Sequence, residues 1–398
     1  MSAFDRSGPG GPDPETVARL VASSTQTWAP PGVVDLGIGQ PDSSLLPAEL
    51  FARAMALAPV ADRHPLQYGG PYGDGYFRLA LGEFLASAYG IPTDPEAIFV
   101  TNGNSQAIEL VCSVFAEPGD VVFVEEPTYF LALDIFRRRG LTVVGIPVDD
   151  DGMSIDALEA ELAVHRPAFV YTIPAFQNPT GATLAPDRRR RLVELASERR
   201  FLIVADEVYQ LLDFGDAGVE PMAASIGSGV VLSLGTFSKI LAPGLRLGWI
   251  QAAMPLLDRL ATTPFVVSGG GLNPFASAVV RPILERGWQQ DHLTSLRVRL
   301  GHRRTVMDRA IRAHLPPDVE FRSPTGGYFF WLRFPGERDT SRWLPSATER
   351  QVGYRPGALF STGSGLTDRI RLSFAFYDSP AIEAAVATLG AIVGSDRA

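Results

Sequence analysis

Short apolar runs rich in β-branched residues alternate with stretches of helical periodicity between about residues 97 and 250. This alternation is typical of a mostly parallel α/β sheet whose strands are joined by helices and buried on both faces. The predicted strands are 98–100, 121–124, 142–146, 169–173, 202–205, 230–234 and 247–251. The predicted helices are 105–116, 128–138, 155–164, 186–198 and a stretch around Tyr209. Ligands of such sheets bind at the carboxyl ends of the strands, where the helices begin.

The chain has 398 residues, which is enough for two domains that share a cleft. After about residue 286, a long helical stretch (291–313) leads into short, antiparallel-looking strands and a closing helix (380–393), which predicts a smaller α+β domain. We therefore expect an N-terminal arm at 1–34, a large domain at 35–285 and a small domain at 286–398. The first part of the large domain is expected to contribute to the small domain and to a dimer interface.

The net charge of −9 argues against binding to nucleic acid, which requires a basic face. Arginine clusters at 137–139 and 188–191 lie on predicted helices with acidic residues nearby, so we expect solvated helix faces there. The chain has no apolar run of about 18 residues that could span a membrane, and its first 14 residues do not resemble a signal peptide. A cytoplasmic protein without a membrane or nucleic-acid partner is expected.

The 35 basic residues comprise 34 arginines and one lysine, Lys239. A primary amine can lose its proton when it is desolvated and attack a carbonyl group, whereas a guanidinium stays protonated. A bias toward arginine could have left one lysine by chance. Lys239 does not lie in a charged helix, however, because Thr236 and Ser238 precede it and a Pro243-Gly244 turn follows.

Polar residues follow three further predicted strands. The turn Thr101-Asn-Gly-Asn-Ser-Gln106 opens a helix and could hold an anion on its backbone N–H groups, although Asn-Gly turns are common. Asp206 ends an apolar strand, and a carboxylate there requires a partner such as a protonated heterocyclic nitrogen; it could also be an N-cap. Asn178 follows a fourth strand within Asn-Pro-Thr-Gly, which could be a simple turn.

Together these strand ends offer an anion cradle, an amide, a carboxylate and a unique lysine at one edge of the sheet. They match a molecule with a phosphate, a phenolic oxygen, a pyridinium nitrogen and an aldehyde. The combination therefore predicts a site for pyridoxal 5'-phosphate.

The chain resembles the class I/II aminotransferases of the fold-type I pyridoxal phosphate enzymes, in particular the branch with 2-aminoadipate, kynurenine and aromatic aminotransferases. The motifs that carry the resemblance run from Leu36-Gly-Ile-Gly-Gln-Pro-Asp42 to Arg369-Ile-Arg-Leu-Ser-Phe374. The most specific are Thr-Phe-Ser-Lys-Ile-Leu-Ala-Pro-Gly-Leu-Arg-Leu-Gly248 and Phe-Gln-Asn-Pro-Thr-Gly181.

The resemblance implies a role for each matching residue. Lys239, Asp206 and Tyr129 would be catalytic: Lys239 forms a Schiff base with the cofactor and moves the Cα proton, Asp206 pairs with the pyridine nitrogen, and Tyr129 stacks on the ring. Asn178 and Tyr209 would bind the ring's 3'-oxygen. The phosphate would be held by the following residues: Gly103, Asn104, Ser105, Thr236, Ser238 and Arg246.

The resemblance also implies where substrate and a second subunit bind. Arg371 would bind the α-carboxylate of the substrate, with help from Gly39 and Asn178, although Arg369 could take that place. Tyr68 would reach the phosphate of the neighbouring subunit, which implies a homodimer with shared active sites. Two departures concern detailed contacts: Asn104-Ser105 stands where relatives commonly have Ser-Gln, and Thr236 stands where serine is usual.

The resemblance implies transfer of an amino group from an L-amino acid to a 2-oxo acid by a ping-pong mechanism. One alternative keeps the cofactor but ends in elimination, cyclisation, decarboxylation or oxidation. Another is a non-catalytic effector domain of a transcription regulator, which would need a DNA-binding extension. An aromatic or 2-aminoadipate-like substrate is slightly favoured. Phe329, Phe330, Trp331 and 265–271 could line its pocket, but core packing is the stronger expectation. The five histidines fall outside every motif, and no metal site is indicated.

Overall fold

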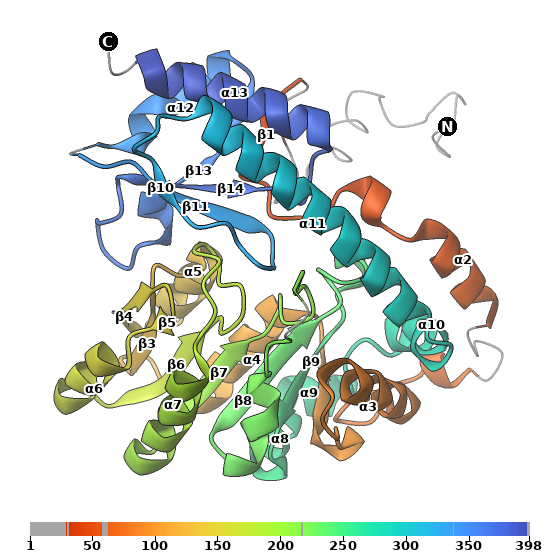
Figure 1. Ribbon diagram of the computed structural model, residues 1–398. Coiled ribbons are helices and arrows are strands. Elements are labelled where there is room, and N and C mark those ends of the chain that lie inside the picture. The colour runs from red at the N-terminus through yellow and green to blue at the C-terminus, as the bar shows by residue number, and fades with distance from the viewer. Residues whose placement is uncertain (1–28, 30–31, 58–62, 216–217, 337, 396–398) are drawn as a thin grey trace, which may run out of the picture.

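The computed structural model describes residues 29, 32–57, 63–215, 218–336 and 338–395, and these form two lobes (Figure 1). The large lobe contains an eight-stranded sheet in the order β2-β9-β8-β7-β6-β3-β4-β5. Its strands are β2 (Ile98–Thr101), β3 (Val121–Glu126), β4 (Thr142–Asp149), β5 (Gly152–Met153), β6 (Pro167–Thr172), β7 (Leu202–Asp206), β8 (Val231–Thr236) and β9 (Gly248–Ala252). The predicted α/β class and the positions of all seven predicted strands are confirmed.

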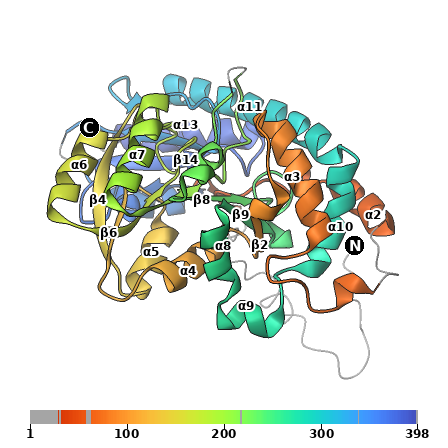
Figure 2. The same ribbon diagram turned by 90° about the horizontal axis from the view of Figure 1, so that it is seen from below.

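Helices cover both faces of this sheet, as Figure 2 shows from below. One face packs on α6 (Ile155–Val164) and α7 (Pro186–Arg199), and the other on α4 (Asn104–Phe115), α5 (Phe130–Arg138) and α8 (Met254–Ala261). Alternate strand residues enter the two apolar cores: Val170 packs with Leu192 of α7, whereas Tyr171 belongs to the core that includes Val111 of α4. Burial on both faces explains why the strands are apolar without a polar side.

The sheet is parallel from β8 to β4, but β9 runs antiparallel to both β8 and β2. The prediction of a helix around Tyr209 was wrong. This segment is a turn, because the chain after it pairs with residues 325–327: Gly327 N–H donates to the Leu212 carbonyl at 3.0 Å and Phe214 N–H to the Thr325 carbonyl at 2.9 Å.

The small lobe contains a four-stranded antiparallel sheet in the order β10-β11-β14-β13. Its strands are β10 (Glu320–Phe321), β11 (Phe329–Arg333), β13 (Arg355–Pro356) and β14 (Arg369–Ser373). A short parallel pair, β1 (Val34–Asp35) and β12 (Val352–Gly353), joins the N-terminal segment to this lobe. The predicted domain boundaries stay a prediction, and almost all of the expected arm at 1–34 lies outside the described residues.

Helices connect and cover the two lobes. The long α11 (Trp288–His314) runs from the large lobe along the small one, where it packs on α13 (Ser379–Ser395) (Figure 1). The remaining helices are α2 (Ala48–Leu57), α3 (Gly75–Tyr89), α9 (Pro264–Gly269), α10 (Pro274–Glu285) and α12 (Leu344–Glu349). Within the described ranges, no helix is both long and apolar enough to cross a bilayer.

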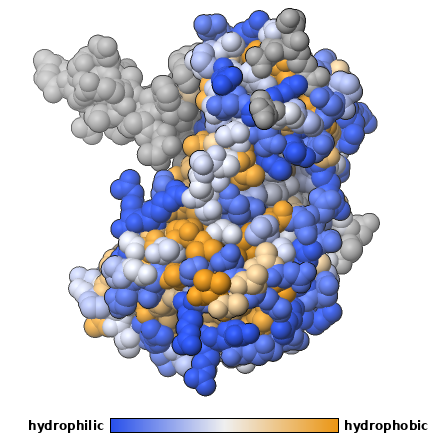
Figure 3. All heavy atoms as spheres, turned by 90° about the vertical axis from the view of Figure 1, so that its left-hand side faces the viewer, coloured by the Kyte–Doolittle hydropathy of each residue, from blue (hydrophilic) through white to orange (hydrophobic). Residues whose placement is uncertain are grey.

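The surface seen in Figure 3 is largely polar on both lobes, with apolar residues gathered on the large one. The expectation that residues 188–191 form only a solvated face was wrong for Arg189, whose exposed fraction is 5%. Its guanidinium donates to the carbonyl oxygens of Leu184 at 2.9 Å and Pro174 at 3.0 Å, and also to that of Glu220. Arg189 is therefore a buried side chain that donates hydrogen bonds to loop carbonyl groups, and it is not part of a charged surface patch.

Candidate active site

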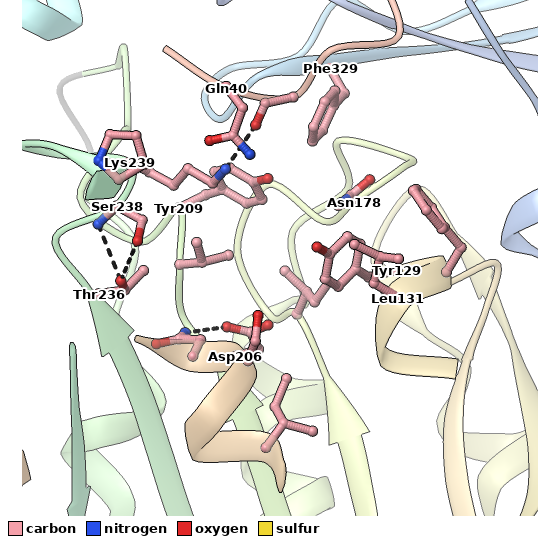
Figure 4. A pocket seen from close by; sticks show the side chains of 18 of the residues that line it. Gln40, Tyr129, Leu131, Asn178, Asp206, Tyr209, Thr236, Ser238, Lys239 and Phe329 are labelled. Carbon is pink, nitrogen blue, oxygen red and sulfur yellow. Dashed lines mark hydrogen bonds between the residues drawn. The ribbon is translucent and has the colours of Figure 1, made fainter. Parts of the chain in front are cut away.

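A cavity of about 730 Å³ lies between the lobes at the carboxyl ends of the parallel strands. Its lining combines residues that follow β6, β7 and β8 with residues of the small lobe and of the segment after β1. Twelve of the predicted site residues line it: Gly39, Asn104, Ser105, Tyr129, Asn178, Asp206, Tyr209, Thr236, Ser238, Lys239, Arg246 and Arg371. Figure 4 shows how most of them point into one space.

Lys239 lies just beyond β8, and its side chain reaches across the cavity toward the small lobe (Figure 4). Its Nζ donates a 2.7 Å hydrogen bond to the carbonyl oxygen of Gly39. Burial lowers the pKa of this amine to about 7, and the positive charges of Arg371 and Arg246 act in the same direction. A large fraction of the amine is therefore neutral and nucleophilic near neutral pH.

Asp206 ends β7 at the floor of the cavity, with an exposed fraction of 3%. Its carboxylate accepts hydrogen bonds from the Nδ2 of Asn104 and, at 2.8 Å, from the hydroxyl of Tyr171. Burial raises the pKa of Asp206, although these hydrogen bonds and Lys239 oppose that shift. A buried carboxylate of this kind is stabilised by a nearby cation, such as a protonated ring nitrogen.

We expected the side chain of Asn104 to face a phosphate, but the structure places it differently. Besides its bond to Asp206, Nδ2 donates to the Leu234 carbonyl at 3.3 Å. The reason is local geometry: Gly103, with a φ of 81°, caps the start of α4 and leaves Asn104 facing the ends of β7 and β8. Asn104 therefore positions Asp206, and the donors at this turn that could hold an anion are its backbone N–H groups and Ser105.

The other expected phosphate contacts gather beside this turn. The Oγ1 of Thr236 donates to the Oγ of Ser238 at 3.0 Å and accepts the backbone N–H of Ser238 at 3.1 Å (Figure 4). The guanidinium of Arg246 lies next to them and donates to the Asn102 carbonyl at 3.2 Å. A Cβ on Gly103 would lie only 3.0 Å from the Nη2 of Arg246, so glycine lets the turn approach the guanidinium closely.

Arg371 projects into the cavity from β14 and is 3% exposed. Its Nη1 donates to the Oδ1 of Asn178 at 2.9 Å and its Nη2 to the Gly37 carbonyl at 2.7 Å, while its buried Nε has no hydrogen-bond partner among the described residues. Arg369, the alternative, is 29% exposed, forms an ion pair with Asp368 and does not line this cavity. The geometry therefore favours Arg371 as the carboxylate-binding residue.

Tyr209 and Tyr129 line the same cavity as Asn178 (Figure 4). Tyr209 is 3% exposed and packs edge-on against Phe329, with ring centroids 5.8 Å apart, and burial raises its pKa well above the usual value. Tyr68 lies apart from the cavity with an exposed fraction of 80%, so its expected contact would have to come from another subunit.

The comparisons with known proteins agree with this geometry. The sequence profile of the family "Aminotransferase class I and II" matches residues 31–389. The chain belongs to the class I and II aminotransferases. It is 36% identical to an aromatic-amino-acid aminotransferase from Thermococcus litoralis over 86% of this chain and 84% of that protein.

Solved structures agree as well. A kynurenine aminotransferase from Pyrococcus horikoshii, crystallised with PMP, matches with a TM-score of 0.86 and 31% identity over 96% of this chain and 94% of that one. An α-aminoadipate aminotransferase from Thermus thermophilus, complexed with N-(5'-phosphopyridoxyl)-L-leucine, matches with a TM-score of 0.83 and 31% identity over 92% and 93% of the two chains. The expected fold type and cofactor, pyridoxal phosphate, are thereby confirmed, and an outcome other than amino-group transfer is not favoured.

The residues of this aminotransferase fit that cofactor. The cavity offers a buried carboxylate at its floor, an amine of lowered pKa, and a cluster of hydroxyl, N–H and guanidinium donors at the start of α4. These groups match a ring nitrogen, an aldehyde and a phosphate, respectively.

Several residues that line the aminotransferase site were not predicted from the sequence, among them Gly37, Gln40, Leu131, Phe130 and Arg355. Phe329 is buried in the core, as expected, and it also lines the cavity and stacks on Arg371, whose guanidinium carbon lies 4.1 Å from the ring centroid. Phe330 is in the core as expected, and Trp331 lines a second cavity beside Arg369. Gly37 and Gln40 lie within the family motif Leu36–Asp42, which could have indicated them as site residues.

Proposed function

We propose that this aminotransferase moves an amino group from an L-amino acid to a 2-oxo acid with Lys239 as the reacting amine, in two half-reactions of a ping-pong mechanism. The observation that carries the proposal is the common cavity of Lys239, Asp206 and Arg371. It combines an amine with a pKa of about 7, a buried carboxylate and a buried guanidinium.

Pyridoxal phosphate, when bound, supplies an aldehyde that joins to an amino group and a ring that withdraws electrons from the bonds at Cα. Asp206 would hold the ring nitrogen in its protonated form, and Asn104 and Tyr171 keep that carboxylate in place. Asn178 and Tyr209 would bind the 3'-oxygen, and Tyr129 would pack on the ring. The phosphate would lie on Gly103, the Asn104 backbone, Ser105, Thr236, Ser238 and Arg246.

Arg371 would bind the α-carboxylate of the substrate with its unpaired Nε and an adjacent Nη atom. Asn178 holds the guanidinium from the large lobe, and Gly39 lies beside it, since a Cβ on Gly39 would be 3.9 Å from the Nη2. This placement fixes the direction of the substrate Cα relative to Lys239.

The Nζ of Lys239 would take the proton from the substrate Cα and hold it. A neutral amine is needed for this step, and the lowered pKa provides one near pH 7. The Gly39 carbonyl holds the Nζ at 2.7 Å and so limits its motion.

The active unit would be a homodimer in which Tyr68 reaches the partner's phosphate site. Several large apolar side chains are exposed near Tyr68 in the fold, on the segment before α3, on α3 itself and on α10: Leu66, Tyr76, Leu79 and Phe275. Exposed apolar side chains that gather in this way are typical of an interface. We place the enzyme in the cytoplasm, because its one cysteine is buried and unpaired and thiols stay reduced in that compartment.

The half-reaction tests the function directly. Holoenzyme mixed with an L-amino acid and no acceptor should lose the absorbance band of the bound cofactor and release one equivalent of 2-oxo acid per active site. Addition of a 2-oxo acid should then restore the band. Release of ammonia, or a requirement for oxygen, would contradict amino-group transfer.

Sedimentation of the holoenzyme tests the assembly. We expect a dimer, and we expect mixed dimers that combine Tyr68→Phe and Lys239→Ala subunits to keep one active site of unaltered composition. A monomer with full activity would contradict the shared site.

A further inference from the structure

A second guanidinium lies beside Arg371 at the active site. Arg355 of β13 and Arg371 of β14 are direct partners in the antiparallel register of the small-lobe sheet. Directly opposed residues of an antiparallel pair project from the same face of a sheet. Both arginines accordingly line the cavity, although Arg355 is more exposed, with 31% of its side chain accessible to solvent.

The backbone of Gly37 locates the two guanidiniums relative to each other. The Gly37 carbonyl accepts the Nη2 of Arg371 at 2.7 Å. A Cβ on Gly37 would lie 2.5 Å from the Nη1 and 2.7 Å from the Cζ of Arg355. The peptide unit of Gly37 therefore lies between the two guanidinium groups. A glycine is needed at position 37, because any Cβ there would clash with the guanidinium of Arg355.

Two like charges on directly opposed strand positions are unfavourable. The charge of Arg355 indeed helps lower the pKa of Arg371 to about 10, after the larger effect of burial. Asp35 offsets part of this cost, because its carboxylate oxygens lie 3.0 and 3.2 Å from the Nη1 of Arg355. That contact engages one nitrogen only, and among the described residues no hydrogen bond or ion pair engages the Nε or Nη2 of Arg355.

We propose that Arg355 binds a second carboxylate, at the side-chain end of the substrate, so that one of the two substrates is a dicarboxylic amino acid or its 2-oxo acid. This inference rests on the proposed function, in which Arg371 takes the α-carboxylate. Asp35 holds the guanidinium in place by one nitrogen, and the opposite edge, with two parallel N–H groups, suits a carboxylate. The substrate charge then also relieves the repulsion between the two arginines.

Binding of simple acids tests this inference without turnover. Holoenzyme is titrated calorimetrically with adipate and with hexanoate, which has the same chain length but one carboxylate. We expect Arg355→Met to weaken adipate binding by about 10- to 100-fold, the effect of losing a charged hydrogen-bond pair, and hexanoate binding by less than about twofold. Arg188→Met is the matched control, because Arg188 is a similarly exposed partner of an aspartate, Asp149, away from the cavity.

Kinetics with paired substrates complete the test. In wild-type enzyme, 2-oxo acids that end in a carboxylate should have a higher kcat/KM than uncharged analogues of the same length, and Arg355→Met should abolish that difference. Arg355→Lys keeps the positive charge but loses the two parallel N–H groups of the guanidinium, so it should retain part of the preference for acids that end in a carboxylate. This variant replaces the methionine variant if the latter does not fold.

Equal losses for both acid classes, or no loss, would overturn the inference, as would a wild-type enzyme that prefers uncharged substrates throughout. The kinetic results require measurable amino-group transfer, and the calorimetric results require only binding. They differ from a failure of the proposed function, in which wild-type enzyme shows no half-reaction with any amino acid.

Discussion

Arg371 of β14 donates a 2.9 Å hydrogen bond to the Oδ1 of Asn178, which follows β6 in the other lobe. The two residues join the small-lobe sheet to the Asn-Pro-Thr-Gly turn at the point where the substrate carboxylate would bind. The active site therefore depends on the relative position of the lobes, and changes at this contact should affect substrate binding more than the fold.

Replacement of Arg371 by leucine should lower kcat/KM for amino acids by on the order of 10²-fold or more, since the loss of one partner of a buried charge pair costs about 2–5 kcal/mol. The cofactor band should persist, because Arg371 does not hold the cofactor. Arg369→Leu is the control and should change kcat/KM only a few-fold. Equal effects of the two variants would contradict the assignment.

The low pKa of Lys239 predicts how cofactor attachment depends on pH. Apoenzyme should recombine with pyridoxal phosphate faster as pH rises through about 7, because the neutral amine is the nucleophile, and the rate should level off above pH 8. Stopped-flow absorbance measures this rate, with Nα-acetyl-lysine as the reference amine of pKa about 10.4. A rate that still climbs steeply between pH 9 and 10 would show an unshifted amine.

Asp206→Asn should lower kcat by on the order of 10²- to 10³-fold, as expected for loss of a preorganised charge at the reacting group. Tyr171→Phe removes one hydrogen bond to the same carboxylate and should cost about tenfold, from about 1.5 kcal/mol. Single-turnover kinetics of the half-reaction distinguish the two variants. A phenylalanine variant as impaired as the asparagine variant would mean that Tyr171, and not the charge of Asp206, dominates.

Glu125 of β3 lies buried beneath the Gln177-Asn178 turn, and burial raises its pKa to about 7. Its oxygens accept from the Thr172 hydroxyl at 2.6 Å, the Ile173 N–H at 3.0 Å and the Gln177 amide at 3.1 Å. The folded pKa exceeds the unfolded value, so the stability from protonated Glu125 is complete below about pH 4.3 and is lost as pH rises through about 7.

Glu125→Gln should remove this dependence, because the amide oxygen can accept two of these bonds and the amide nitrogen can donate to Thr172. The free energy of unfolding, measured in urea, should fall between pH 5 and pH 8 by up to about 3 kcal/mol more for wild type than for the variant. A constant difference across this range would contradict a raised pKa of Glu125.

The site residues that the strand pattern indicated before the resemblance was considered share one property: each lies at or shortly after the end of a strand. Asp206, Asn178 and Lys239 were found because a buried parallel strand fixes where its last residue lies. Arg355 was missed because its place at the cavity depends on contacts with a segment 320 positions away, of which Asp35 is a part. No local pattern encodes that pairing.

Other differences between the predicted and the observed structure also result from contacts between residues far apart in the sequence. The Tyr209 segment has helical periodicity, but pairing with residues 325–327 overrides it. Arg189 has the sequence context of a surface residue, yet loop carbonyls on three sides of it require a buried donor. The side chain of Asn104 bonds to Asp206, 102 positions later, and not to a group in the space beside the turn.

The role of Lys239 as the amine that holds the cofactor can be tested directly. Holoenzyme is reduced with borohydride, digested, and its peptides are mapped by mass spectrometry. Lys239 is the single lysine in the sequence, so it is the one side chain that offers a primary amine to the cofactor. We expect one phosphopyridoxyl-labelled peptide, with the label on Lys239. A label at any other position, or a cofactor released without a label, would show that another group holds it.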